Sequence, residues 1–212
     1  VTFGMTHMQG MILGAVIIIF YTLMGGFLAV AWTDLLQGMI MICTLIVLPL
    51  VGLIELSGTD SVRILDWSTL YNGKTGIAAL AATIGGLSWG VGYLGQPHLL
   101  VRYMAIDKAE NIAASRKIAY AWAIPAFFGA MFIGLIGSSL IENGLLNFDG
   151  NTIISINQLP DQEKLMPIMA KSLLPAWLAG IFISGAIAAM MSTADSQLLV
   201  STTVLTEDIA RK

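Results

Sequence analysis

The sequence predicts an all-α, polytopic transmembrane helix bundle, and three observations support this. Of the 212 residues, 57% are hydrophobic and only 11% are charged, whereas soluble domains carry about 25% charged residues. Mean hydropathy is +0.83. The charges gather in short stretches, and several runs between them reach the ~20 apolar residues that a helix needs to cross a bilayer. We therefore expect a multi-pass protein surrounded by lipid.

Five spans are expected, at about 8–24, 27–56, 77–101, 118–140 and 173–205. Gly25-Gly26 separates the first two, and polar loops at 57–76 and 141–171 separate later ones. The chain begins with Val1, ends in a polar tail and has no signal-peptide pattern. We therefore expect residues 1–212 to form a single transmembrane fragment of a longer protein.

Basic residues predict the orientation of these spans. The polar stretches divide into two sides, and the more basic side contains Arg102, Lys108, Arg116, Lys117, Arg211 and Lys212. The positive-inside rule places this side in the cytoplasm. The Gly25-Gly26 turn is then cytoplasmic and the loops at 57–76 and 141–171 are outside. We expect the cytoplasmic membrane as the location.

Composition argues against several classes of function. The net charge is −3 and no stripe of Lys and Arg follows any segment, so we expect no nucleic-acid partner. Cys43 is the single cysteine, and the two histidines lie on different segments. The sequence has no nucleophile with a base beside it, no zinc-protease pattern and no phosphate-binding loop. An enzyme is therefore not expected.

The last apolar run carries hydroxyl groups on one helical face. Ala189, Ser192, Thr193 and Ser196 follow at i, i+3, i+4 and i+7. Their oxygens suit a hard cation such as Na⁺. Spacing alone, however, favours helix packing, because small residues are common at membrane helix interfaces. Ser and Thr can also bond to carbonyls of their own helix.

Asp34 is a carboxylate in an apolar context, with Thr33 and Gln37 beside it. One interpretation is an ion pathway through the membrane. The other is a position at the cytoplasmic interface, where the dipole of a helix N-terminus stabilises a negative charge. The sequence leaves both open.

Residues 88–98 combine aromatic residues with glycines and a proline. Trp89, Tyr93 and Pro97 share a face if the helix is regular. The glycines and Pro97 favour a kink or an unwound segment, and secondary transporters build substrate sites from broken helices. An aromatic belt at the membrane interface is the alternative. His98 is interpreted as an interfacial residue because Arg102 follows it closely.

Residues 21–34, 89–98 and 188–199 resemble the sodium:solute symporter family, most closely its bacterial sodium/proline symporter branch. The resemblance implies a LeuT-type inverted-repeat fold, of which this chain covers core helices 4–8. It also implies Na⁺ as the coupling ion. For the main Na⁺ site it implies the carbonyl of Ala189 and the hydroxyls of Ser192 and Thr193. A second Na⁺ site or pathway is implied at Asp34, Asp195 and Ser196.

The same resemblance implies a substrate and a function. Trp89, Tyr93 and Pro97 match positions linked to proline binding, with Gln96 as a neighbour. The implied function is Na⁺-coupled symport of a small solute, most closely L-proline, into the cell. Two alternatives are open: a membrane sensor domain of a histidine kinase built on the same fold, and a symporter for another small carboxylate such as pantothenate.

Overall fold

The computed structural model describes residues 5–59, 75–93, 95–148, 150–159 and 161–210. The side chains of His7, Trp89 and Ala210 also lie outside this description. The helices are α1 (His7–Leu56), α3 (Ile77–Tyr93), α4 (Pro97–Met104), α5 (Asn111–Glu142), α6 (Leu165–Leu173) and α7 (Ala176–Thr203). A short hairpin, β1 (Leu146–Phe148) and β2 (Asn151–Ile153), lies between α5 and α6.

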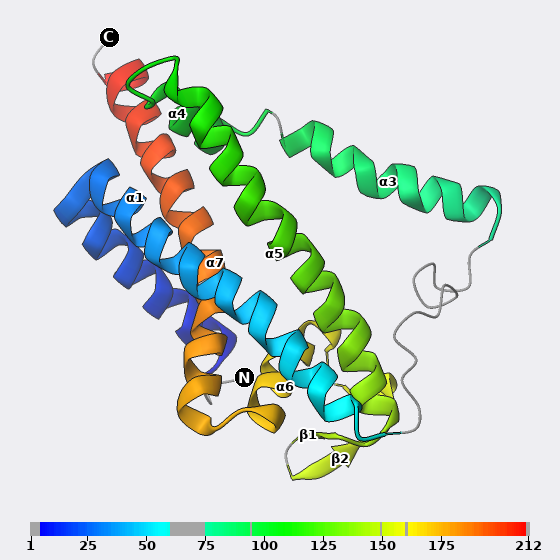
Figure 1. Cartoon of the computed structure of the whole chain (residues 1–212). Coiled ribbons are helices and arrows are strands. Elements are labelled where there is room, and N and C mark those ends of the chain that lie inside the picture. Colours follow the sequence, from blue (N-terminus) through cyan, green and yellow to red (C-terminus); the bar gives the residue numbers. More distant parts are fainter. Residues whose placement is uncertain (1–4, 60–74, 94, 149, 160, 211–212) are drawn as a thin grey trace.

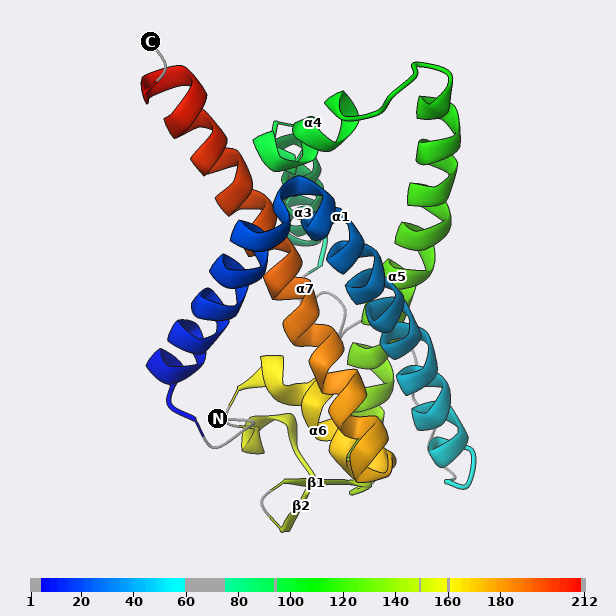
Figure 2. The ribbon, with the colours of Figure 1, turned by 90° about the vertical axis from the view of Figure 1, so that its left-hand side faces the viewer.

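Helix α1 is broken at Gly26, where the sequence analysis places its break. Gly26 has φ 55° and ψ −150°, a backbone conformation that is essentially restricted to glycine. The helix begins with a capping box, in which the Thr6 hydroxyl accepts the Gln9 backbone N–H. The two halves of α1 diverge from this turn (Figure 2).

Helices α1, α5 and α7 form the bundle (Figure 1). A cluster of buried apolar side chains lies at one end of it. That end holds the C-terminal part of α1, the C-terminal half of α5, α6 and the first turns of α7. Fully buried members include Leu48, Leu140, Leu146 and Met169. In the N-terminal half of α5, Trp122 Nε1 donates a hydrogen bond to the Gly38 carbonyl of α1 at 3.1 Å.

The loop expected at 141–171 contains regular structure. Leu146 pairs with Ile153 across the hairpin, and both side chains are buried in the apolar cluster. Helix α6 follows although it contains Pro167, because proline in the first turn removes an N–H that has no partner within the helix anyway. The charges and prolines of this segment predicted a loop. The structure shows instead that the hairpin and α6 pack against the apolar cluster at the end of the bundle.

The third expected span is interrupted in the structure. Helix α3 ends at Tyr93, α4 begins at Pro97, and their axes differ by 49°. In α3, no described side chain is buried, and the helix projects away from the bundle (Figure 1). Helix α4 instead packs beside α7.

Three helical stretches in the described residues are long and apolar enough to cross a membrane: Met8–Leu56, Asn111–Glu142 and Ala176–Ile209. The pair α3 and α4 could form a fourth. These helices agree with an all-α integral membrane bundle. The division into five spans stays a prediction, and residues 60–74 of one expected loop lie outside the description.

The more basic polar stretches share one end of the molecule. The Gly26 turn, α4, the start of α5 and the C-terminal end of α7 all lie there (Figure 2), opposite the hairpin and α6. Arg102, Lys108, Arg116 and Lys117 belong to these segments, whereas Arg211 and Lys212 lie outside the described residues. The basic stretches that the positive-inside rule assigned to one side of the membrane therefore lie at one end of the fold, where they are described.

Candidate functional site

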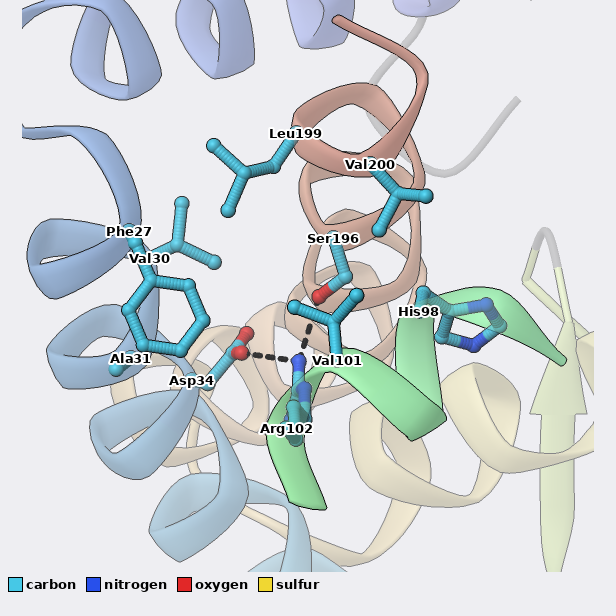
Figure 3. A pocket seen from close by; sticks show the side chains of 10 residues that line it. All are labelled: Phe27, Val30, Ala31, Asp34, His98, Val101, Arg102, Ser196, Leu199 and Val200. Atoms are coloured by element: carbon cyan, nitrogen blue, oxygen red, sulfur yellow. Dashed lines mark hydrogen bonds and ion pairs between the residues drawn. The ribbon is translucent and has the colours of Figure 1, made fainter. Parts of the chain in front are cut away.

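A charged cluster joins α1, α4 and α7 at the end opposite the apolar cluster (Figure 3). The Arg102 guanidinium forms an ion pair with the Asp34 carboxylate. The same Nη2 atom donates to Ser196 Oγ at 2.5 Å. Asp34 comes from the second half of α1, Arg102 from the last turn of α4, and Ser196 from α7. One arginine thus connects three elements.

Local sequence explains how Arg102 reaches this position. Gln96 is the N-cap of α4 and Pro97 occupies the first helical turn, where a fixed φ favours helix initiation. The helix therefore restarts after the glycine-rich segment in a new direction. Its last turn lies across α1 and α7, which places the guanidinium between them.

A cavity of about 130 Å³ adjoins this cluster. Its walls come from α1, α4 and α7, and are mainly apolar apart from the charged cluster and one histidine. The lining residues are Phe27, Val30, Ala31, Asp34, His98, Val101, Arg102, Ser196, Leu199 and Val200. The His98 ring points away from Asp34 (Figure 3). The cavity has room for a small solute or a few water molecules.

A second polar contact ties the first half of α1 to α7. Tyr21 Oη donates to Asp195 Oδ2 at 2.5 Å. Asp195 is completely buried, and its Oδ1 accepts from Ser196 Oγ at 3.2 Å. Both carboxylate oxygens thus lie within hydrogen-bond distance of a hydroxyl group, although Ser196 Oγ has a single proton and also lies 2.8 Å from the Ser192 carbonyl oxygen. Asp195 thus contacts the first half of α1 directly, and the neighbouring Ser196 is linked to Asp34 in the second half through Arg102.

The three residues expected at the main Na⁺ site bring their oxygens together. Ser192 Oγ and Thr193 Oγ1 both donate to the Ala189 carbonyl, at 3.0 Å and 3.3 Å. Ser192 is half-buried and Thr193 is exposed. They do not line the cavity; Ser196, one turn further along, does. The hydroxyls satisfy their own helix in this arrangement, so the packing and ion-binding interpretations both remain open.

The expected substrate residues are not brought to the charged cluster. Tyr93 is 40% exposed at the end of α3, Pro97 is exposed and Gln96 is half-buried. The Trp89 backbone lies in α3, but its side chain is outside the description. Trp89, Tyr93 and Pro97 would share one helical face only in a continuous helix, and the interruption between α3 and α4 separates Pro97 from the other two. The substrate assignment stays a prediction.

Several acceptor oxygens are buried without a hydrogen-bond partner in the described part of the chain. They are Thr22 Oγ1, Asp34 Oδ1 and Gln37 Oε1. Buried polar atoms normally have a partner, so an unpaired carboxylate oxygen beside a cavity suits a cation or water. No group of three His, Cys, Asp or Glu side chains within the described residues could hold a metal ion. Oxygen ligands of mixed type are the ion-binding chemistry that this site offers.

Two contributors were missed by the sequence analysis. Tyr21 was part of an apolar run, and Arg102 was counted only as a topological charge. The available signal for both was the same as for Asp34: a polar group within or next to an apolar helix, which needs a partner. The sequence did not indicate which partner each one has.

The fold and the site define an integral membrane protein with charged and hydroxyl groups gathered between its helices, as transport proteins have. The chain belongs to the sodium:solute symporter family, whose model matches residues 1–212. It is therefore a member of a transporter family rather than of an enzyme family.

Individual relatives agree with this assignment. The chain is 36% identical to the sodium/proline symporter of Escherichia coli K12 over 216 residues, 98% of this chain and 40% of the relative. It is 35% identical to sodium/proline symporter 2 of Staphylococcus saprophyticus over 213 residues, 97% of this chain and 38% of the relative. The chain spans about two fifths of the length of these relatives. No solved structure matches it.

Proposed function

We propose that the complete protein is a Na⁺-coupled symporter of the cytoplasmic membrane that imports a small solute, with L-proline as the first candidate. The observation that carries this proposal is the family match over the whole chain. The names of the relatives suggest proline. In this proposal, residues 1–212 supply five spans equivalent to core helices 4–8 of a LeuT-type fold, and the rest of the protein completes it.

The proposed main Na⁺ site uses the Ala189 carbonyl with the Ser192 and Thr193 hydroxyls. The proximity of these three oxygens supports it, because both hydroxyls lie within hydrogen-bond distance of that carbonyl. To bind the ion, the hydroxyls would turn their lone pairs toward it. Neutral oxygens bind a monovalent ion weakly enough to release it, and discontinuous transporter helices coordinate Na⁺ with such groups.

We assign the second Na⁺ site or pathway to Asp34, Asp195 and Ser196, and the substrate wall to Trp89, Tyr93, Gln96 and Pro97. The mechanism is thermodynamic linkage. Na⁺ and solute both favour one outward-facing state, so each raises the affinity for the other, with a coupling of typically 1–3 kcal/mol. The membrane potential adds about 2.3 kcal/mol per charge for each 100 mV.

The direct test is uptake of radiolabelled L-proline by the complete protein in proteoliposomes. An inward Na⁺ gradient should drive accumulation, and an equal K⁺ gradient should not. Unlabelled solutes, including other amino acids and pantothenate, then compete for uptake. Na⁺-driven uptake of a solute other than proline would correct the substrate. The absence of Na⁺-driven uptake of every solute tested would contradict the proposal.

Removing a hydroxyl from the proposed main site should raise the Na⁺ requirement. We expect Ser192→Ala and Thr193→Ala each to increase the half-saturating Na⁺ concentration by about tenfold, equivalent to ~1.4 kcal/mol for a lost ligand. The matched control is Ser201→Ala. Ser201 Oγ makes the same type of bond, donating to the Gln197 carbonyl at 2.8 Å on the same helix. If all three variants show the same Na⁺ dependence, the two site hydroxyls serve helix packing only.

Shortening the proposed substrate wall should affect the solute rather than the ion. Tyr93→Ala is expected to raise the KM for proline several-fold while leaving the half-saturating Na⁺ concentration nearly unchanged. Tyr93 is 40% exposed at the C-terminal end of α3. Proline-dependent and Na⁺-dependent uptake curves measure the two effects. A parallel loss of both affinities would count against a substrate contact.

A further inference from the structure

The Arg102 guanidinium occupies the place that Na⁺ would take at the proposed second Na⁺ site. It contacts the Asp34 carboxylate and, at 2.5 Å, the Ser196 hydroxyl. These are two of the three residues assigned to that site. Two cations cannot share the same oxygens without strong repulsion. Occupation by Arg102 and occupation by Na⁺ therefore exclude one another.

The two members of this ion pair differ in their access to water. The Asp34 side chain is only 11% exposed, whereas the Arg102 side chain is 45% exposed. Arg102 can withdraw into solvent at little desolvation cost. Asp34 cannot, and a buried carboxylate without a countercharge is strongly destabilised. When the arginine leaves, another cation must take its place, and Asp34 Oδ1 has no hydrogen-bond partner in the described part of the chain.

Arg102 is also a principal polar attachment of α4. This helix has only eight residues and no buried residue, so apolar packing holds it weakly. The Asp34 and Ser196 contacts fasten its last turn to α1 and α7. The Val101 and Arg102 side chains form part of the cavity wall (Figure 3). Release of Arg102 would therefore free α4 and open the cavity at this end.

We propose that Arg102 is a tethered competitor of Na⁺: it closes the α4 end of the cavity by binding Asp34 and Ser196, and Na⁺ reaching these oxygens displaces it and releases α4. This inference rests on the proposed function. Arg102 then has two roles: it keeps α4 in the closed position, and it responds to the arrival of Na⁺. A structural arginine would stabilise the protein and would have no effect on how tightly Na⁺ binds.

The test compares Arg102→Gln with the unchanged complete protein in proteoliposomes. Removing the competitor should lower the half-saturating Na⁺ concentration at least fivefold, and Arg102→Lys should lower it less, because the lysine keeps the charge but not the planar fork. Arg116→Gln is the matched control. Arg116 is an exposed basic residue at the same end, and it forms no ion pair within the described residues. It should leave the Na⁺ dependence unchanged.

A second measurement needs no transport activity. Spin labels at Met104→Cys and Ser201→Cys report the distance between α4 and α7, in a background of the complete protein from which Cys43 and every cysteine outside residues 1–212 have been removed. Both labelled positions are exposed. Na⁺ should lengthen and broaden this distance, K⁺ should not, and Arg102→Gln should show the broad distribution without Na⁺. An unchanged or raised Na⁺ requirement in Arg102→Gln, or a distance insensitive to Na⁺, would overturn the inference. If the unchanged protein lacks Na⁺-driven uptake, the proposed function fails instead.

Discussion

Replacing Gly129 by alanine is expected to force α5 away from α1 and to lower the thermal stability of the complete protein markedly. A Cβ atom at Gly129 would lie 2.2 Å from the Leu45 carbonyl oxygen and 2.8 Å from its carbonyl carbon. These are backbone atoms, so no side-chain rotation relieves the clash and the helices themselves must separate. Close backbone approach at small residues is a main source of helix association in membranes. We expect a loss of about 1–3 kcal/mol, as for overpacked cores.

Gly134→Ala provides the matched control on the same helix. A Cβ at Gly134 has no atom within 4 Å, and both substitutions bring the same gain in intrinsic helix propensity, up to about 1 kcal/mol. The measurement is the melting temperature of each purified variant in detergent. Gly129→Ala should melt well below the unchanged protein, and Gly134→Ala at or above it. Equal melting temperatures of the two variants would show that α1 and α5 are not packed this closely.

The features that the sequence predicted well depend on short stretches of chain. The apolar runs give the helices, because a bilayer requires about 20 apolar residues per crossing. Gly25-Gly26 marks the break in α1, because the conformation of Gly26 excludes a side chain. The interruption near Pro97 follows from local chemistry in the same way. None of these conclusions requires knowledge of how one helix faces another.

The contacts that the sequence missed depend on the rotation and register of separate helices. Tyr21 and Asp195 are 174 residues apart, and Asp34 and Arg102 are 68 apart. Helices that are apolar on all sides give no periodic signal for the face that meets a neighbour. Arg102 was also counted only for its charge, because the positive-inside rule treats basic residues as equivalent. The structure was needed to show that this residue reaches between α1 and α7.

Removing the Tyr21 hydroxyl is expected to weaken the attachment of the first half of α1 to α7. Tyr21 Oη donates to the fully buried Asp195 carboxylate, and hydrogen bonds to charged groups contribute about 1.5–3 kcal/mol. Tyr21→Phe should therefore lower the free energy of unfolding, measured in mixed micelles with increasing SDS, by roughly this amount. Tyr120→Phe is the control. Tyr120 is 60% exposed on α5, and the change should stay within about 0.5 kcal/mol.

A double-mutant cycle with Asp195→Asn separates the roles of the two residues. Asparagine keeps the shape of the side chain but removes its charge. The hydrogen bond from the Tyr21 hydroxyl then joins two neutral groups and is weaker. Much of the Tyr21→Phe loss of stability should therefore disappear in the Asp195→Asn background, since the coupling energy isolates the shared contact.

The Na⁺ concentration required for uptake adds a second criterion for the role of Asp195. Asp195→Asn should raise it because a charge near the proposed ion pathway is lost, whereas Tyr21→Phe should change it less than twofold. Additive losses of stability would mean that the hydroxyl and the carboxylate do not interact in the folded protein. An unchanged Na⁺ requirement in Asp195→Asn would confine that carboxylate to holding α1 against α7 and leave Asp34 as the acidic group that meets the ion.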